Sequence, residues 1–211
     1  MFARNVITRR GRGFRGKVPS IKLGRMVAGE SLTECDAILA LEFSPGVLSY
    51  REQPTLVQYV SGDSIRDYYP DFEVVLITGE VIHVEIKTVH DLAKPVNQAK
   101  YCAIAADYAR RGHGFRILTD QDIRQGNLYT NLKLLESCLH VKPETSSPNE
   151  WQQQFGRAPT VFSMVADRLG RAEVLRLIAW GFAHGDLWLP LAGDTKVQLI
   201  EKGGCDATYL L

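Results

Sequence analysis

Two apolar runs separated by a short polar segment dominate the middle of the chain. Residues 72–77 and 81–86 consist mostly of valine, isoleucine and other strand-forming residues, and residues 78–80 between them read Thr-Gly-Glu. β-branched residues in runs of this length are typical of strands, and a glycine between two such runs is typical of a turn. The pattern therefore predicts a β-hairpin, closed by a three-residue loop in which Gly79 takes a positive φ.

Three charged residues fall at one end of this predicted hairpin, and its register decides where they point. Glu85 and Lys87 are two residues apart, so they share one face of the second strand. A three-residue loop at 78–80 sets Asp71 opposite Lys87 and on that same face. A two-residue turn would set Asp71 opposite Ile86, on the other face. We expect the three-residue loop, which gathers two carboxylates and an ammonium group at one end of a sheet.

These residue types suit the hydrolysis of a phosphodiester. Two carboxylates can hold Mg²⁺, or Mn²⁺ in its place, and such a cation polarises a phosphoryl oxygen and lowers the pKa of a bound water. A neighbouring lysine can stabilise the charge of the transition state. Pro70-Asp71 followed by Glu85-Ile86-Lys87 resembles the PD-(D/E)xK nuclease superfamily. The alternative for the same residues is the polar face of a half-exposed strand.

The elements around the hairpin predict a mixed α/β layer, and the superfamily resemblance implies a restriction-endonuclease-like mixed sheet flanked by helices. Further helical and strand patterns occur on both sides of the hairpin. Helices are predicted at 31–43, 96–111 and 127–139, and strands at 47–50, 55–60 and 115–119. In the helix at 96–111 we expect a face of small residues to pack on the sheet, namely Ala99, Ala103 and Ala106.

Glu34 has two interpretations. Residues 31–34 read Ser-Leu-Thr-Glu, which fits the capping box of a helix N-terminus. Glu34 also lies one turn before Ile38, on a face that packs inward, where a carboxylate could be the third acid of a metal site. Spacing alone favours neither interpretation.

The charge of the chain is distributed unevenly. Residues 1–25 contain eight arginines and lysines and no acid, so the remainder holds 17 basic and 24 acidic residues, although the whole chain carries a net charge of only +1. We interpret residues 1–25 as a basic arm that contacts the phosphates of DNA, in preference to a solubilising or targeting tail. The candidate DNA-binding residues are Arg9, Arg10, Arg12, Arg15 and Lys17.

The C-terminal part reads as a separate module. Residues 142–149, KPETSSPN, have the composition of a linker between a nuclease domain at 26–141 and a second domain at 150–211. Helices are predicted at 159–169 and 171–184, and strands at 186–191 and 197–200. This order predicts a small winged-helix-like domain, and the alternative is a helical extension packed on the nuclease core.

The C-terminal module is rich in aromatic and other apolar residues, and its few cations form no cluster. Side chains of this kind are favoured as anchors of protein–protein interfaces, which predicts that the module docks protein and not DNA. The candidate anchors are Trp180, Phe182, Leu187 and Trp188.

Other residue types exclude several classes of protein. The four cysteines form no C-x-x-C pair, which argues against a zinc site or a disulfide framework and fits a reducing compartment. No apolar run approaches the roughly 20 residues that cross a bilayer, and no apolar segment of a secretory signal follows the basic N-terminus. His83 shares the predicted face of Glu85, where it could line the site, but we expect it to be a packed structural histidine.

Taken together, the sequence resembles the TnsA family, the endonuclease subunit of TnsABC-type cut-and-paste transposons. The matching segments follow one another in the family's order: ESLTE at 30–34, EQP at 52–54, YPDF at 69–72 and EIK at 85–87, with YARRGHGFRILTD at 108–120 beyond them. The resemblance implies that Glu34, Asp71 and Lys87 are catalytic. Glu85 is the acid of the wider superfamily, at a position where some TnsA members carry glutamine.

The resemblance also implies a function and partners. A TnsA-like protein cuts the 5′ ends of a transposon with Mg²⁺ held by Glu34, Asp71 and Glu85. A TnsB-type transposase cuts and joins the 3′ ends, and a TnsC-type AAA+ ATPase carries target information. Small TnsA-like proteins also occur in CRISPR-associated transposons, and the expected location is the bacterial cytoplasm, at the nucleoid and not at a membrane. Two alternatives stay open: a stand-alone PD-(D/E)xK restriction or repair nuclease, and a non-catalytic DNA-binding assembly subunit with a nuclease-like fold.

Overall fold

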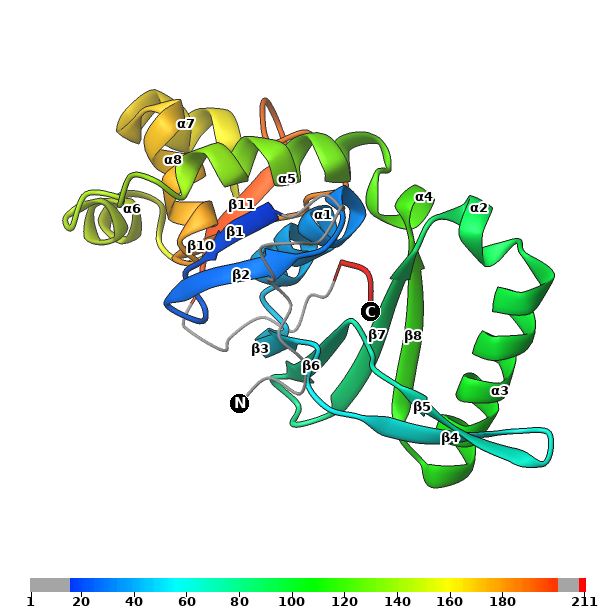
Figure 1. Ribbon diagram of the computed structural model, residues 1–211. Coiled ribbons are helices and arrows are strands. Elements are labelled where there is room, and N and C mark those ends of the chain that lie inside the picture. Colours follow the sequence, from blue (N-terminus) through cyan, green and yellow to red (C-terminus); the bar gives the residue numbers. More distant parts are fainter. Residues whose placement is uncertain (1–15, 201–208) are drawn as a thin grey trace. The chain divides into compact units, whose positions relative to one another are not determined.

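The computed structural model describes residues 16–200 and 209–211, and these divide into two compact units (Figure 1). The first unit contains Val47–Ile123, the described residues before Leu39, and the last two residues of the chain. The second contains Leu39–Gly46 and the described residues from Arg124 to Tyr209. Helix α1 (Leu32–Phe43) begins in the first unit and ends in the second. None of the described helices has the length and apolar content needed to cross a bilayer.

The first unit is built on a four-stranded mixed sheet. The strands lie in the order β3 (Val47–Glu52), β6 (Phe72–Leu76), β7 (Val81–Lys87) and β8 (Gly114–Thr119). Strands β3, β6 and β7 are antiparallel neighbours, whereas β7 and β8 run parallel. A parallel pair needs a crossover connection, and helices α2 (Val89–Leu92) and α3 (Pro95–Arg111) supply it. The predicted mixed α/β class is confirmed, and the arrangement is consistent with a restriction-endonuclease-like fold.

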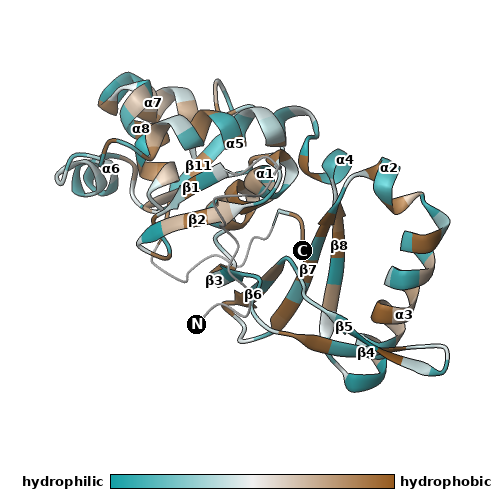
Figure 2. Cartoon of the chain, in the orientation of Figure 1, coloured by the Kyte–Doolittle hydropathy of each residue, from teal (hydrophilic) through white to brown (hydrophobic). Residues whose placement is uncertain are grey.

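The two parallel strands, β7 inside the sheet and β8 at its edge, carry many buried apolar residues. Val84, Ile86 and Leu118 are all less than 10% exposed, and Figure 2 shows β7 and β8 as largely hydrophobic arrows. Strands with helices or hairpins on both faces read as nearly continuous apolar runs. The charged residues near the end of β7 therefore interrupt an apolar strand. Helix α4 (Asp120–Ile123) follows directly after β8.

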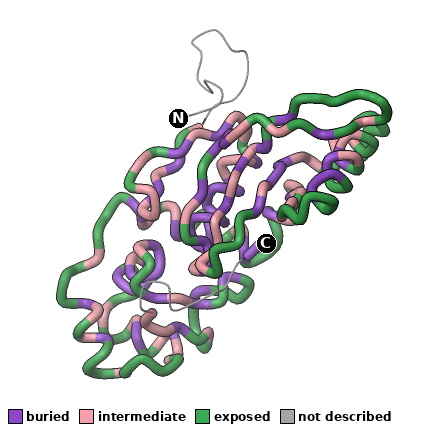
Figure 3. The backbone as a smooth tube through the Cα atoms, turned by 90° about the horizontal axis from the view of Figure 1, so that it is seen from below, coloured by how far each residue is buried: buried purple, intermediate pink, exposed green. Residues whose placement is uncertain are grey.

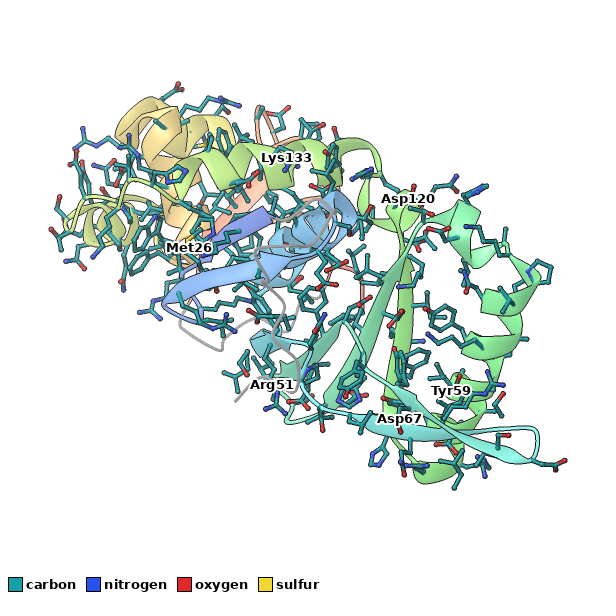
Figure 4. The ribbon with its side chains drawn as sticks, in the orientation of Figure 1. Met26, Arg51, Tyr59, Asp67, Asp120 and Lys133 are labelled. Atoms are coloured by element: carbon teal, nitrogen blue, oxygen red, sulfur yellow. The ribbon has the colours of Figure 1, made fainter. Side chains whose placement is uncertain are left out.

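Strands β4 (Val57–Ser61) and β5 (Ser64–Tyr68) form a separate hairpin that packs on α3. The inner face of this hairpin carries Tyr59 and Tyr68, and Figure 4 shows Tyr59 between the hairpin and α3. Both tyrosines belong to one buried cluster with three residues of α3, namely Tyr101, Ile104 and Tyr108. The residues around the tip of the hairpin are exposed (Figure 3). The hairpin is thus anchored at its base by aromatic packing.

The aromatic face of α3, and not its alanine face, packs inward. Tyr101, Ile104 and Tyr108 recur at helical spacing and are at most 3% exposed, whereas Ala99 and Ala106 are exposed. The expectation that the alanines pack inward was therefore wrong for Ala99 and Ala106, whereas Ala103 is partly buried against the tyrosine cluster. Large aromatic rings bury far more apolar area than alanine, so the tyrosine stripe determines how the helix is oriented.

Part of the predicted basic arm is folded. Strands β1 (Gly16–Ser20) and β2 (Arg25–Gly29) form an antiparallel hairpin in which Val18 pairs with Val27, and both valines are buried. The arm as predicted, 1–25, is therefore corrected to end before Gly16. The burial of Val18 and Val27 and the contact of Arg25 with Glu52 stabilise this hairpin. Composition alone had assigned residues 16–25 to the basic arm.

The second unit combines helices with a small sheet. Helices α5 (Gly126–Cys138), α6 (Ser147–Phe155), α7 (Phe162–Leu169) and α8 (Arg171–Ala179) belong to it. Strands β9 (Thr160–Val161), β10 (Ala183–Gly185) and β11 (Lys196–Leu199) form a three-stranded sheet in the order β10-β11-β9. The winged-helix interpretation of this unit stays a prediction.

Two predicted elements of the second unit were misplaced. Helix α8 ends at Ala179, five residues before the predicted end, because Gly181 has φ 75° and closes a Schellman motif in which the Phe182 N–H donates to the carbonyl of Leu177. The strand predicted at 186–191 is replaced by β10, which lies before that segment. Helix α6 begins inside the predicted linker 142–149.

The boundary between the units also differs from the predicted one. The units divide between Ile123 and Arg124, so α5 belongs to the second unit, whereas the sequence assigned it to a nuclease domain ending at 141. The side-chain amide of Asn131 on α5 donates to the carbonyls of Leu187 and Leu189. α5 also packs against α8. These contacts explain why α5 groups with the residues that follow it.

Candidate active site

The β6–β7 hairpin positions the candidate residues, and its loop lies one residue earlier than predicted. The Leu76 carbonyl accepts from the Gly79 N–H, and the Leu76 N–H donates to the Glu80 carbonyl, so the three loop residues are 77–79. Gly79 has φ 86°. In a type I turn closed by a bulge the left-handed position is the last of the loop, which places Gly79 there and not in the middle.

This shift of the loop moves the strand register by two residues, but each side chain stays on its predicted face of the sheet. Phe72 pairs with Val84, so the next pair along sets Asp71 beside Glu85, and the predicted pairing of Asp71 with Lys87 was wrong. A shift of two residues leaves every side chain on its predicted face, because side chains alternate with a period of two. Asp71, Glu85 and Lys87 therefore meet at one end of the sheet.

Lys87 lies between the two carboxylates. Its Nζ atom is 2.6 Å from Glu85 Oε1 and 3.6 Å from Asp71 Oδ2, and it donates to the carbonyl of Ile86 at 2.9 Å. Asp71 Oδ2 also accepts a 2.7 Å hydrogen bond from the Ile86 N–H. Asp71 Oδ1 accepts no hydrogen bond from any described residue. The site thus has a carboxylate oxygen that remains open to a ligand.

Two tyrosines hold Glu85. The hydroxyl of Tyr68 donates to Glu85 Oε2, and that of Tyr101 donates to Glu85 Oε1, each at 2.6 Å. Glu85 is 3% exposed, so its charge is compensated by these hydroxyls and by Lys87 in place of water. Burial raises the pKa of both tyrosines and the neighbouring Glu85 carboxylate adds to the rise, which keeps both hydroxyls protonated as donors.

The charges at the site are unevenly compensated. Burial raises the pKa of Asp71 to about 8, and the charge of Glu85 adds to this rise, while Lys87 opposes it. Burial would lower the pKa of Lys87, but Asp71 and Glu85 outweigh burial and raise it. One ammonium therefore serves two carboxylates, and a further cation beside Asp71 would relieve the excess negative charge.

Glu34 lies at the N-terminus of α1 and acts there as a cap. Its Oε2 atom accepts from the Glu30 N–H at 2.8 Å, its Oε1 accepts from the Ser31 hydroxyl at 3.0 Å, and the Glu34 N–H donates to Ser31 Oγ. Burial raises the pKa of Glu34, whereas these hydrogen bonds and the charge of Lys87 lower it. Glu34 also raises the pKa of Asp71, so the cap is electrostatically coupled to the other acids.

The donor set fits a hard divalent cation by its chemistry. Three carboxylates interact electrostatically, one of their oxygens is open, and Mg²⁺ and Mn²⁺ prefer oxygen ligands. No three His, Cys, Asp or Glu side chains in the described part of the chain already stand in the geometry of a metal site. The hydrogen bonds of Glu85 to its tyrosines and of Glu34 to its cap account for this, because they direct those oxygens to protein donors.

His83 belongs to a separate network on the same face. Its Nδ1 is 2.7 Å from the Tyr108 hydroxyl, its Nε2 is 3.2 Å from Glu73 Oε2, and Glu73 pairs with Arg51. Burial lowers the pKa of His83, against the opposing effect of Glu73. These contacts are those of the packed structural histidine expected from the sequence.

The candidate DNA-binding residues are only partly described. Arg9, Arg10, Arg12 and Arg15 lie outside the described residues, and Lys17 is exposed on β1. The last cation of the predicted arm, Arg25, has a structural contact, because its guanidinium binds both carboxylate oxygens of the buried Glu52 at 2.7 and 2.6 Å.

Comparison with known proteins adds to this geometry. Residues 44–120 match the family model described as TnsA-like endonuclease N terminal. The chain contains a TnsA-like endonuclease domain. The match includes Asp71, Glu85 and Lys87, and Glu34 lies outside it. A search of curated proteins found no match.

The TnsA-like domain also contains site residues that the sequence analysis did not single out. Tyr68 precedes the Tyr69-Pro70-Asp71 segment by one residue, and Tyr101 belongs to the stripe with Ile104 and Tyr108. The helical spacing of that stripe was a visible signal. The hydrogen bonds to Glu85 were not visible, because they depend on how α3 lies against β5 and β7.

Proposed function

We propose that this protein is a metal-dependent DNA endonuclease that cuts the 5′ ends of a transposon during cut-and-paste transposition. The observation that carries the proposal is the match of residues 44–120 to TnsA-like endonucleases, together with the acid, acid and lysine that meet inside this segment. A TnsA-like endonuclease domain indicates a nuclease related to transposition. The cut position, the metal dependence and the partners are part of the proposal.

In this proposal Asp71, Glu85 and Glu34 hold Mg²⁺, or Mn²⁺ in its place. Asp71 Oδ1 is the open oxygen, and a bound cation would compensate the excess negative charge around Asp71. When bound, the cation polarises the phosphodiester and lowers the pKa of a water. Because its pKa is raised, Lys87 stays protonated at neutral pH. Its ammonium group stabilises the charge that develops on the phosphate. Tyr68 and Tyr101 keep Glu85 in place beside Lys87.

The proposed partners are a TnsB-type transposase and a TnsC-type AAA+ ATPase. The test is an excision assay on DNA that carries transposon ends, with the full chain in Mg²⁺, with and without a candidate transposase. We expect cleavage at the 5′ ends only when the transposase is present. Cleavage of any duplex by the protein alone would favour a stand-alone nuclease, and binding without cleavage under all conditions would favour a non-catalytic assembly subunit.

We propose further that residues 1–15 bind DNA through its phosphates. This segment contains five arginines and no acid. Each neutralised phosphate contributes roughly −0.9 to the slope of log K against log salt concentration. Deleting residues 1–15 should therefore flatten this slope on duplex DNA by up to about 0.9 for each arginine that contacts a phosphate. The deletion removes no residue of the β1–β2 hairpin, and circular dichroism of the shortened protein checks that it is folded. Unchanged affinity and slope would show that the DNA lies elsewhere.

The second unit is proposed to dock a protein partner. Phe182, Trp188 and Leu189 are each more than 40% exposed, whereas Leu187, one of the expected anchors, is 1% exposed and belongs to the core. Trp180 is half-buried, with Lys142 Nζ 5.6 Å from its ring centre. The expectation for Leu187 was therefore wrong, and Phe182 and Trp188 remain as anchors, joined by Leu189.

The corresponding test changes exposed side chains and leaves the fold in place. Truncation near residue 142 would cut the second unit apart, since Arg124–Tyr209 belongs to this unit as one continuous segment. We expect the double variant Trp188→Ser/Leu189→Ser to weaken capture of the transposase or ATPase by about 10-fold or more, as loss of interface anchors does. Met164→Ser is the matched control, because Met164 is 54% exposed on α7. Equal capture by both variants would remove this surface from partner binding.

A further inference from the structure

Lys100 is a second lysine beside the candidate active site. It lies on α3, and its Nζ atom is 4.9 Å from the ring centre of Tyr101 and 5.4 Å from that of Tyr68. These are the two tyrosines whose hydroxyls hold Glu85. The faces of aromatic rings carry partial negative charge and attract an ammonium group at these distances. The rings therefore favour a position of the Lys100 ammonium close to the residues that hold Glu85.

Lys100 differs from the neighbouring lysines in its partners. Lys87 is paired with Glu85, and Lys94 is paired with Asp91. No acid among the described residues forms an ion pair with Lys100. The aromatic faces accept no strong hydrogen bond, so the three N–H donors of Lys100 remain available to an external acceptor. Lys100 is half-buried and contacts two aromatic rings, and no described acid compensates its charge.

The place of Lys100 indicates the kind of acceptor. Lys87 Nζ lies 5.8 Å from the ring centre of Tyr101, so both ammonium groups are within 6 Å of one ring. Lys87 is engaged by the acids of the site, and Lys100 has no such acid. The ligand that the proposed nuclease brings to this site is a DNA strand, which carries one negative charge at every nucleotide. Two successive phosphates of such a strand could therefore be contacted by Lys87 and Lys100, which lie beside the same Tyr101 ring.

We propose that Lys100 binds a phosphate of the DNA strand next to the one that is cut. The proposal rests on the proposed nuclease function and adds a substrate-binding residue to it. Tyr68 and Tyr101 then have two roles in one arrangement. Their hydroxyls position Glu85 beside Lys87, and their ring faces position Lys100 for the neighbouring phosphate. A lysine contacts the phosphate as a point charge, without reading the base sequence.

The test measures DNA binding by the full chain without metal, so that no cleavage takes place. We expect Lys100→Met, which keeps the alkyl chain on the rings and removes the charge, to reduce the magnitude of the log K against log salt slope by roughly 0.9 on any duplex. Lys100→Arg should keep the wild-type slope. Lys133→Met is the matched control, because it removes one positive charge from an exposed lysine of α5 that pairs with Glu136. This control should leave the slope unchanged.

Two outcomes would overturn the proposal: an unchanged slope in Lys100→Met, or an equal loss in Lys133→Met. Circular dichroism establishes whether Lys100→Met is folded, and Lys100→Gln is the second charge-removing variant if it is not. Cleavage is measured separately in Mg²⁺. If the slope depends on Lys100 but the protein never cleaves DNA, the phosphate contact is supported and the proposed nuclease function is contradicted. If the wild-type protein cleaves DNA but Lys100→Met leaves the slope unchanged, the nuclease function is supported and the phosphate contact is contradicted.

Discussion

Asp71→Asn is expected to abolish strand cleavage and to leave the fold intact. Asparagine keeps an oxygen that can accept from the Ile86 N–H, so the backbone contact that Asp71 makes at 2.7 Å survives. It removes the negative charge that a divalent cation needs. Loss of a metal ligand removes several kcal/mol of transition-state stabilisation, and each 1.36 kcal/mol is tenfold in rate, so we expect a loss of roughly 10³-fold or more. The measurement is single-turnover cleavage of end-bearing DNA with the partner proteins present.

The same variant should be more stable than the wild type at neutral pH. Because the pKa of Asp71 is raised to about 8, the folded state holds a proton there that the unfolded chain loses above its ordinary pKa of 3.8. The folded state therefore binds more protons between about pH 4 and pH 8, and the free energy of unfolding falls as the pH rises through that window. Asp71→Asn should remove this decline. Undiminished cleavage would exclude Asp71 from the mechanism, and an unchanged pH dependence would contradict the electrostatic account.

Lys87→Met is expected to abolish cleavage and also to destabilise the fold. Glu85 is 3% exposed, and Lys87 is the cation with which it pairs, at 2.6 Å. Removing one partner of a buried pair leaves an uncompensated charge, which costs about 3 kcal/mol. The two tyrosine hydroxyls remain as donors to Glu85, so we expect the protein to stay folded at low temperature. Urea denaturation gives the loss of stability, and the cleavage assay gives the loss of activity.

A double variant separates these two effects. Glu85→Gln/Lys87→Met removes both charges, so most of the lost stability should return while cleavage remains absent. Lys133→Met, which breaks an exposed pair on α5, controls for the loss of a lysine and should change stability little. A Lys87→Met protein as stable as the wild type would show that Lys87 does not compensate the buried acid.

The faces of the central hairpin could be predicted from sequence, whereas its register could not. The alternation of strand side chains places Asp71, Glu85 and Lys87 together for any even shift of register. The exact pairing depends on the turn, and the choice between Gly79 as the middle or the last loop residue moved it by two residues. The acids and the lysine were therefore predictable as a group, and their opposite partners were not.

The supporting residues depended on tertiary contacts. Tyr68 and Tyr101 lie 33 positions apart in the numbering and meet at Glu85 only because the β4–β5 hairpin and α3 share one cluster. Helix propensity predicted α3 within one residue of its start, but small alanines suggested the wrong packing face. The folded hairpin at 16–29 escaped prediction because arginines and glycines conceal its two buried valines.

The β1–β2 hairpin fixes the point from which the N-terminal segment departs. Gly16 pairs with Gly29, and the next residue, Glu30, donates its N–H to Glu34. Fifteen residues span at most about 50 Å when fully extended. The chain therefore lets none of the five arginines of residues 1–15 lie farther than this from Gly16. Duplex DNA rises 3.4 Å per base pair, so under the proposal that these arginines bind DNA, the bound phosphates would lie within about 15 base pairs of the candidate site.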